Sequence, residues 1–413
     1  MSWVPRAVLA AGVLVACHTN PPAPAQQPIA IAPAESLGFD SARLAAVAAY
    51  VASQVDSAYP GAVVAVGRHG RLVLLSAAGH YGNDDPRPID RSTIFDLASL
   101  TKVIGLTTAC ALLVEEGKLD LDAPVQRYLP AFRGPDKDRV TIRHLLTHSS
   151  GLPADRPLYK EAKDRHSALA LVDTTPLDTA PGTRFVYSDL GAIVLMQVVE
   201  QITGERLDRY LARRVFGPLG MTATRFLPPA IWRDRIAPTE IDTVFRHRLI
   251  RGQVHDENAG RMGGVSGHAG LFSNAPDLVK FAVWLMEART DTTSICHGMV
   301  DTRYGRMYLP VSCSRISVET ADLFTARQTL PPGSTRALGW DTPSDSGYSS
   351  AGSKLSRLSF GHTGFTGTSI WMDPERDLFV ILLTNRVNPT RANTKILQVR
   401  AVVADLVAEA MNR

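Results

Sequence analysis

Ser99 and Lys102 stand three residues apart, where extended, β-prone residues give way to a helical pattern. In a helix, residues three apart lie on one face, one turn apart, so the serine hydroxyl and the lysine amine can meet. A serine is a poor nucleophile at neutral pH, but a desolvated lysine can lose its charge and accept the serine proton. The spacing therefore indicates a serine nucleophile, although S-x-x-K alone is common by chance.

Two further motifs follow in order, Tyr187-Ser188-Asp189 and His362-Thr363-Gly364. Together the three motifs resemble the signature of serine β-lactamases and penicillin-binding proteins. A middle motif that begins with tyrosine is similar to class C β-lactamases, their esterase relatives and D-Ala-D-Ala carboxypeptidases. The chain departs from that pattern at Asp189, where Asn is usual, and at His362, which replaces Lys as in many non-lactamase members. The resemblance extends from about Leu37 to the C-terminus.

The resemblance implies a role for each motif. Ser99 would be the nucleophile, Lys102 its base or the electrostatic partner of one, and Tyr187 would exchange protons with the serine and the leaving group. The backbone N–H groups of Ser99 and Phe365 would form the oxyanion hole. Taken singly, Ser99 also fits a helix cap, Lys102 a surface lysine and Tyr187 a core tyrosine. The residues expected to bind substrate are Asp189, His362, Thr363, Gly364, Phe365 and Asp155.

The two departures from the family pattern have chemical consequences. An ionised Asp189 accepts hydrogen bonds but cannot donate them, and it would tend to keep Lys102 protonated. His362 stands where many relatives place a cation that holds a substrate carboxylate, and a largely neutral imidazole is a weaker anchor than lysine. Both changes argue against efficient β-lactamase activity.

A glycine-rich segment carries a further resemblance. His255-Asp256-Glu257-Asn258-Ala259 leads into the segment 262–273, and the pair resembles a subgroup associated with muropeptide recycling, which includes N-acetylmuramoyl-L-alanine amidases. His255 and His268 could line the pocket or could be structural. The favoured function is a serine hydrolase that forms an acyl-Ser99 intermediate on an amide or ester, with a cell-wall peptide or muropeptide as substrate. The alternatives are a carboxylesterase, a β-lactamase, or a non-catalytic receptor for cell-wall peptides.

The surrounding pattern predicts an α+β fold. Residues 41–55 have apolar residues at helical spacing, and residues 61–67 and 72–76 form a strand-like pair joined by a turn. A second strand pair at 368–373 and 378–385 precedes a closing helix at 391–412. We expect one antiparallel sheet built from about 37–98 and 335–413 and flanked by the terminal helices, with a mostly helical region at about 99–334 packed against it.

Composition restricts the partners. The chain has 413 residues, 45% of them hydrophobic, and a formal net charge of +4 without a basic run, so nucleic acid is not an expected partner. No metal-binding motif stands out, and no cofactor is expected. Cys110 lies in an apolar helical pattern that predicts a buried thiol. Cys296 and Cys313 could form a disulfide in an oxidising compartment, and their spacing leaves this open.

The N-terminus predicts export and anchoring. Residues 1–16 read as a signal peptide that ends at Leu14-Val15-Ala16-Cys17, which resembles a bacterial lipoprotein box. Cleavage before Cys17 would leave a lipidated cysteine on a Pro-rich and Ala-rich tether, residues 17–36. His18 follows where an Asp would retain the protein at the inner membrane, which favours the periplasmic face of the outer membrane. An ordinary signal peptide with a chance cysteine is the alternative.

Overall fold

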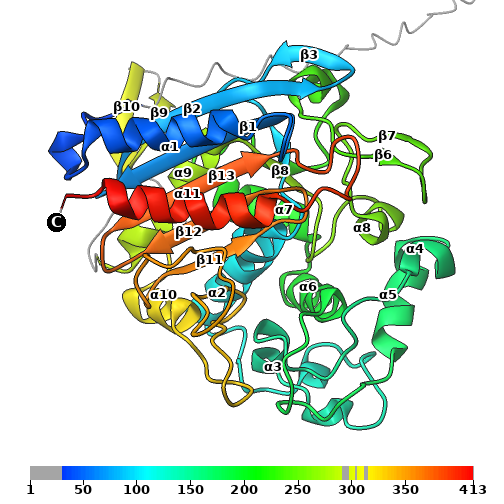
Figure 1. Ribbon diagram of the computed structural model, residues 1–413. Helices are drawn as coiled ribbons and strands as arrows, with labels where there is room; N and C mark the ends of the chain where they lie inside the picture. The colour runs from blue at the N-terminus through cyan, green and yellow to red at the C-terminus, as the bar shows by residue number, and fades with distance from the viewer. Residues whose placement is uncertain (1–29, 291–296, 303–304, 311–314, 413) are drawn as a thin grey trace, which may run out of the picture.

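Valine-rich residues early in the chain and leucine-rich residues near its end form one six-stranded antiparallel sheet with the order β11-β12-β13-β1-β2-β3 (Figure 1). In this computed structural model, residues 30–290, 297–302, 305–310 and 315–412 are described. The central pair places Val64 of β1 opposite Leu382 of β13. The strands are β1 (Gly61–Arg68), β2 (Arg71–Gly82), β3 (Asp85–Pro88), β11 (Phe360–Thr363), β12 (Ser369–Asp373) and β13 (Leu378–Thr384).

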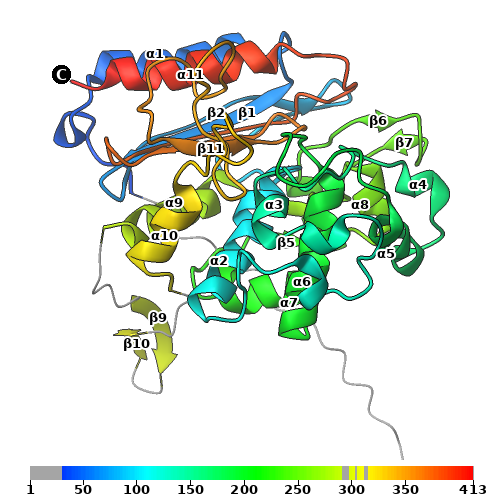
Figure 2. The same ribbon diagram turned by 90° about the horizontal axis from the view of Figure 1, so that it is seen from below.

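Alternation along β1 separates two cores. Val63 faces the core shared with the helical region, whereas Val64 and Val66 face the core shared with the terminal helices. Those helices, α1 (Ser41–Ser53) and α11 (Ile396–Ala410), lie side by side on one face of the sheet (Figure 2). The predicted sheet and flanking helices are confirmed.

The closing helix begins at Ile396 instead of residue 391. The carbonyls of Arg391 and Asn393 accept hydrogen bonds from the Arg386 guanidinium, at 3.0 and 2.7 Å, which holds this stretch outside the helix.

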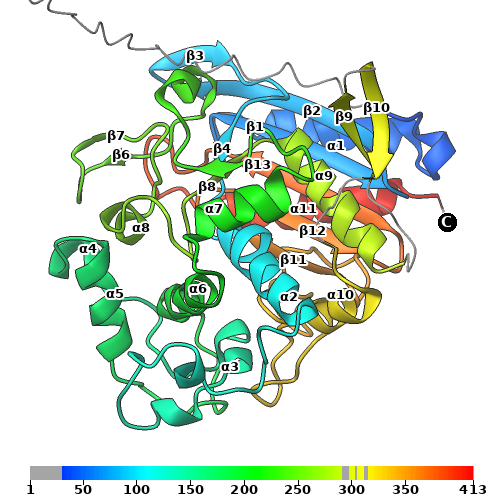
Figure 3. The ribbon, with the colours of Figure 1, turned by 180° about the vertical axis from the view of Figure 1, so that it is seen from behind.

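The helical region covers the other face of the sheet, where α9 contacts β1 and β13 (Figure 3). Among the described residues, no helix combines the length and apolar character needed to cross a bilayer. The helices of this region are α2 (Thr108–Glu115), α3 (Ile142–Leu146), α4 (Leu158–Glu161), α5 (Arg165–Thr174), α6 (Asp189–Thr203), α7 (Leu207–Leu211), α8 (Glu257–Arg261), α9 (Ala275–Ala288) and α10 (Val318–Thr325).

Short strands also lie outside the main sheet, which the expected division into sheet and helical parts did not include. They are β4 (Phe95–Asp96), β5 (Arg225–Phe226) and β8 (Leu271–Ser273) in one sheet, β6 (Ile241–Asp242) with β7 (Arg248–Leu249), and β9 (His297–Thr302) with β10 (Gly305–Pro310). A strand of two or three residues is too short to show alternation in sequence. Conversely, residues 335–359 contain no strand, and β11 begins only at Phe360.

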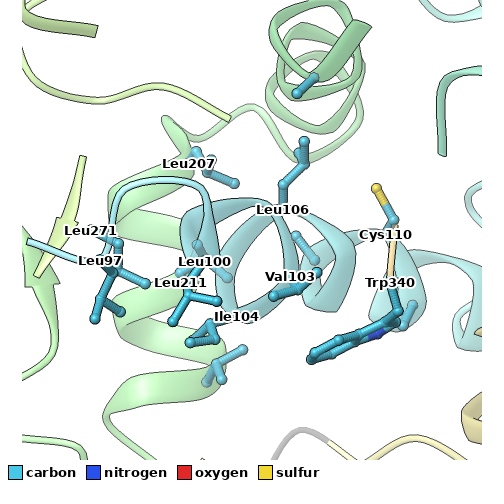
Figure 4. Packing of buried hydrophobic residues seen from close by; sticks show 14 of the residues in the cluster. Leu97, Leu100, Val103, Ile104, Leu106, Cys110, Leu207, Leu211, Leu271 and Trp340 are labelled. Atoms are coloured by element: carbon cyan, nitrogen blue, oxygen red, sulfur yellow. The ribbon is translucent and has the colours of Figure 1, made fainter. Parts of the chain in front are cut away.

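Apolar packing fixes the segment that carries the S-x-x-K motif. Leu100, Val103 and Ile104 are fully buried and lie among Leu207, Leu211 and Leu271 (Figure 4). The predicted buried thiol is confirmed, because Cys110 is buried and free, and burial raises its pKa. Cys17, Cys296 and Cys313 lie outside the described residues, as do the predicted signal peptide and most of the tether.

Candidate active site

Ser99 follows a constrained turn at the end of β4. Ala98 adopts a φ of 46°, in the left-handed region that residues with a side chain rarely occupy. The Asp96 carboxylate supports this conformation by accepting hydrogen bonds from the Ala98 N–H at 2.8 Å and the His255 N–H at 2.6 Å. The Thr366 hydroxyl donates to the Asp96 carbonyl at 2.7 Å. Ser99 therefore sits on a turn that two distant segments, at His255 and Thr366, hold in place.

The structure brings Ser99 and Lys102 together, as their spacing predicts. Lys102 lies in a π-helical turn, η2 (Thr101–Thr107), and its Nζ donates to Ser99 Oγ at 3.0 Å and to the His268 carbonyl at 3.2 Å. Lys102 Nζ also lies 2.7 Å from Asp189 Oδ1. Turns of this kind are frequent at functional sites.

Lys102 is an ammonium in the resting site. Burial favours the neutral amine, but the interactions of Lys102 with Asp189 and Tyr187 outweigh it and raise the lysine pKa above its ordinary value. The expectation that desolvation neutralises Lys102 is therefore wrong for the resting site, and the effect expected of Asp189 prevails. Asp189 is the first residue of α6, where the helix dipole also favours a carboxylate.

Tyr187 is held between two histidines. Its ring centroid lies 4.6 Å from that of His148 and 5.9 Å from that of His362. Lys102 Nζ lies over the tyrosine ring, 4.8 Å from its centroid. His148 Nδ1 accepts a hydrogen bond from the Ser188 N–H at 3.1 Å, which ties the middle motif to the preceding loop. Tyr187 is thus positioned beside the ammonium that contacts Ser99.

His362 is neutral and buried. It is 3% exposed, and its Nδ1 lies 2.8 Å from the Thr363 carbonyl. Burial and the nearby charges of Arg336 and Lys102 hold the pKa of His362 well below its usual value. Within the described part of the chain its Nε2 has no hydrogen-bond partner. His362 therefore offers an acceptor atom, not the cation that many relatives carry here.

The loop after β11 closely approaches the turn that precedes Ser99. A Cβ atom on Gly364 would lie 2.4 Å from the Leu97 carbonyl oxygen, so only glycine fits this position. No acceptor among the described residues binds the N–H of Ser99 or of Phe365. These two donors suit the oxyanion hole that the family resemblance implies.

A cavity of about 480 Å³ opens onto Ser99, and its lining includes Tyr187, His362, Phe365 and Arg336. Arg336 was not predicted. Its side chain is 9% exposed, and its Nη1 lies 3.1 Å from Asp341 Oδ1. Its Nε and Nη2 have no hydrogen-bond partner among the residues that the structure describes, and its Cζ lies over the rings of Phe185 and Tyr187, 5.7 and 5.8 Å from their centroids.

A sequence signal for Arg336 existed but was weak. The residue precedes the apolar stretch Ala337-Leu338-Gly339-Trp340, whose apolar side chains are buried. An arginine inside a buried stretch is uncommon unless it is paired.

Three other candidates lie beside the cavity, not in its lining. Asp155 Oδ1 accepts a hydrogen bond from Asn258 Nδ2 at 2.8 Å. His255 Nε2 lies 2.9 Å from Glu240 Oε2, and His268 Nε2 lies 2.9 Å from Asp256 Oδ1.

One cluster has the composition of a cation site. Potential ligand atoms of Asp189, Asp256 and His268 lie within 4.8 Å of one another. The Lys102 ammonium already brings positive charge to Asp189, so the four residues form a network of charges.

Comparison with known proteins agrees with this arrangement. A family model described as Beta-lactamase matches residues 45–404. A relative from Salmonella schwarzengrund (strain CVM19633), named "Putative D-alanyl-D-alanine carboxypeptidase", is 32% identical over 397 residues, covering 88% of this chain and 87% of its own. A similarly named protein from Salmonella enteritidis PT4 (strain P125109) is 32% identical over 403 residues, covering 89% of this chain and 88% of its own.

Solved structures share the fold. EstCE1, described as a hydrolase with promiscuous acyltransferase activity, matches with a TM-score of 0.65 and 26% identity over 90% of this chain and 99% of its own. A penicillin-binding protein homologue from Caulobacter crescentus matches with a TM-score of 0.66 over 89% of this chain and 97% of its own, and at 20% identity this shows the fold alone. The chain therefore belongs to the β-lactamase family, in the superfamily of serine β-lactamases and penicillin-binding proteins.

Proposed function

We propose that this protein is a serine carboxypeptidase of cell-wall peptides or muropeptides. Ser99 Oγ attacks the carbonyl of the terminal peptide bond, and its proton passes through Tyr187 and Lys102 to the departing amine. The carbonyl oxygen receives hydrogen bonds from the N–H groups of Ser99 and Phe365. Water then attacks the acyl-Ser99 ester, which releases the shortened peptide and restores the serine hydroxyl.

Arg336 is the observation that carries the proposal. A carboxypeptidase must bind a terminal carboxylate, and His362 is neutral. Arg336 is nine-tenths buried in the cavity wall and has two unpartnered nitrogens, Nε and Nη2, in the described structure. A guanidinium with two adjacent free donors matches a carboxylate in geometry and charge. The names of the Salmonella relatives support the same substrate class.

The test compares two substrates on one variant. Arg336→Met should lower kcat/KM for a peptide ending in D-Ala-D-Ala by about 10–100-fold, the value of a charge-assisted hydrogen bond. Hydrolysis of the uncharged p-nitrophenyl acetate should change less than about twofold. Arg327→Met is the matched control, because Arg327 pairs with Asp345 and does not line the cavity. Equal losses on both substrates, or no release of D-alanine by the wild type, would contradict the proposal.

An esterase is the second candidate, because the cavity mouth is apolar. Phe365 and Leu397 both line the cavity and are each 47% exposed. These side chains can bind an acyl or aryl group, and EstCE1 is described as a hydrolase with acyltransferase activity. Fast turnover of apolar esters without release of D-alanine would favour this function. Nitrocefin in the same panel tests β-lactamase activity, and a fluorescent acylating probe that fails to label would favour a non-catalytic receptor.

We also propose that the protein is a lipoprotein held by Cys17 at the periplasmic face of the outer membrane. The support is the Leu14-Val15-Ala16-Cys17 sequence and the Pro-rich residues that follow it. Metabolic labelling with a fatty acid should mark the wild type and not Cys17→Ser. Equal labelling of both proteins would contradict lipidation at Cys17.

A further inference from the structure

An ion pair between a buried histidine and a partly exposed aspartate lies beside Lys102. His268 is 1% exposed, and its Nε2 lies 2.9 Å from Asp256 Oδ1. Its other ring nitrogen, Nδ1, lies 2.8 Å from Ser266 Oγ. Both nitrogens thus face oxygen atoms that can accept, the arrangement that suits a doubly protonated imidazolium. Asp256 Oδ1 also accepts from the Ala259 N–H at 2.7 Å, which fixes the carboxylate at the start of α8.

This pair is joined to the nucleophile through Lys102. The His268 carbonyl accepts a hydrogen bond from Lys102 Nζ at 3.2 Å, and the same Nζ lies 2.7 Å from Asp189. Because Asp189, His268 and Asp256 also lie close together, the charges alternate from lysine to aspartate to imidazolium to aspartate. Lys102 already balances the charge of Asp189, so His268 and Asp256 add a second matched pair of charges to this network.

The surrounding charges keep the pair ionised. Burial and the charge of Lys102 lower the pKa of His268. The carboxylates of Asp256 and Asp189 raise it by more, so the pKa of His268 lies above its ordinary value. Burial raises the pKa of Asp256, but the charge and hydrogen bond of His268 outweigh it, and the pKa is lowered. Asp96, Asp155 and His255 are further titratable groups that interact with this pair.

We propose that Asp256 and His268 are positioning residues for the nucleophile: their ion pair orients Lys102 and places an imidazolium beside Asp189. An imidazolium at His268 attracts the Asp189 carboxylate, which weakens the attraction between Asp189 and Lys102. The imidazolium also repels the lysine ammonium. Lys102 can then release and regain a proton closer to neutral pH than it could beside Asp189 alone. The inference rests on the Ser99–Lys102 nucleophile of the proposed function and not on the substrate class.

The first experiment uses the pH dependence of Ser99 acylation by a fluorophosphonate probe. His268→Gln removes the imidazolium and leaves Asp256 unpaired, so the acidic limb of the profile should move up by about one pH unit. The double variant with Asp256→Asn also lacks the unpaired Asp256 carboxylate, so the acidic limb of its profile should return most of the way to the wild-type position. A merely structural role would lower the rate in both variants without moving the limb. An unmoved limb in His268→Gln, or an equal shift in the double variant, would overturn the proposal.

A matched control is available elsewhere in the chain. His69, on the exposed β1–β2 turn, has its Nδ1 2.9 Å from Asp377 Oδ2, so His69→Gln removes a histidine–aspartate contact that lies outside the three motifs. Its acylation profile should match the wild type.

The second experiment needs no substituted enzyme to be active. The imidazole resonances of His268 in the wild type, assigned by their loss in His268→Gln, should show a protonated ring through pH 7. Titration of His268 below its ordinary pKa of about 6.5 would overturn the proposal even if the variants failed to fold. A wild type that takes no fluorophosphonate label would instead reject the proposed nucleophile, which keeps the two failures distinguishable.

Discussion

The two sides of Ser99 differ in how their charges are paired. On the cavity side, Arg336 keeps two nitrogens without a partner in the described structure, and the His362 Nε2 is likewise unpaired. On the opposite side, Asp256 and His268 pair with each other, and Asp189 contacts Lys102. Leaving a buried polar atom unpaired costs about 1–3 kcal/mol. The unpaired side is therefore suited to a ligand, and the paired side is suited to setting protonation states.

The other arginines that line the cavity sharpen this contrast. Arg400 Nη2 donates to the carbonyls of Gly364 and Thr368, at 2.6 and 2.9 Å, and Arg386 Nε donates to the Phe365 carbonyl at 2.8 Å. These guanidinium groups hold the loop after β11 in place. Of the lining arginines in the described chain, Arg336 has the most donor capacity left for a substrate.

The largest effect is expected at the point where the two sides meet. Ser99→Ala should lower turnover by roughly 10⁴-fold or more and abolish probe labelling, because only the nucleophilic oxygen is lost. The melting temperature should stay near that of the wild type. Ser92→Ala is a control, since that hydroxyl contacts Asp90. A probe adduct on any serine other than Ser99 would disprove the assignment.

Removing the proton-transfer groups should have the next largest effect. Tyr187→Phe and Lys102→Ala should each lower kcat by roughly 10²–10⁴-fold with little change in KM. The two variants should differ in stability, because Lys102→Ala leaves the Asp189 carboxylate and the His268 carbonyl without the ammonium, whereas Tyr187→Phe removes only a hydroxyl. Steady-state kinetics and thermal unfolding of both variants measure this. Near-normal rates in Tyr187→Phe would remove Tyr187 from the mechanism.

Local sequence patterns predicted the parts of the site that depend on short-range spacing. The Ser99–Lys102 contact follows from helical spacing, and the two strand pairs follow from apolar runs separated by turns. The contact between Lys102 and Asp189 was also expected, because the middle motif of this family meets the first. What the sequence could not show is how distant loops meet.

Arg336 and His268 illustrate this limit. The carbonyl of His268 reaches Lys102 across 166 residues. Arg336 comes from a stretch without regular structure, so no periodicity marks which way its side chain points. Which charged groups pair with one another depends on how the chain folds, so sequence motifs alone do not predict it.

A moderate effect is expected from making His362 cationic. The sequence suggests that His362→Lys would improve acylation by penicillins more than ester hydrolysis and that lower pH would mimic it. The structure alters both expectations, because the site is buried and faces Arg336 and Lys102. A lysine there would be desolvated beside two positive charges, so the gain should stay below about tenfold.

The pH dependence tests the same point. His362 has a pKa well below its usual value, so acidification from pH 7.5 to 6 should not protonate it. The ratio of nitrocefin acylation rates between the wild type and His362→Gln should therefore stay constant over that range. A ratio that rises steadily as the pH falls would show that His362 titrates, and would restore it as a carboxylate anchor.

The smallest effect is expected from Asp155, which the family resemblance places in contact with substrate and the structure places with Asn258. In the variant Asp155→Asn, the amide oxygen of the new side chain would still accept that hydrogen bond, so kcat/KM for peptides should change less than about twofold. Burial and the charges of Asp189 and Asp256 raise the pKa of Asp155, so its ionised form opposes folding.

The charge of the Asp155 carboxylate should affect the free energy of unfolding even though it has little effect on activity. The pKa of Asp155 is higher in the folded protein than in the unfolded chain, so the protonated carboxyl group favours folding. This contribution to the free energy of unfolding is complete below the unfolded pKa of about 3.9, and it is lost as the pH rises through the folded pKa. Asp155→Asn should therefore increase the free energy of unfolding at pH 7, by less than about 0.5 kcal/mol because the side chain is partly open to solvent, which screens its charge. The difference should vanish near pH 3.5 in chemical denaturation. A tenfold loss of kcat/KM for peptides with normal ester hydrolysis would instead move Asp155 to the binding side of the site.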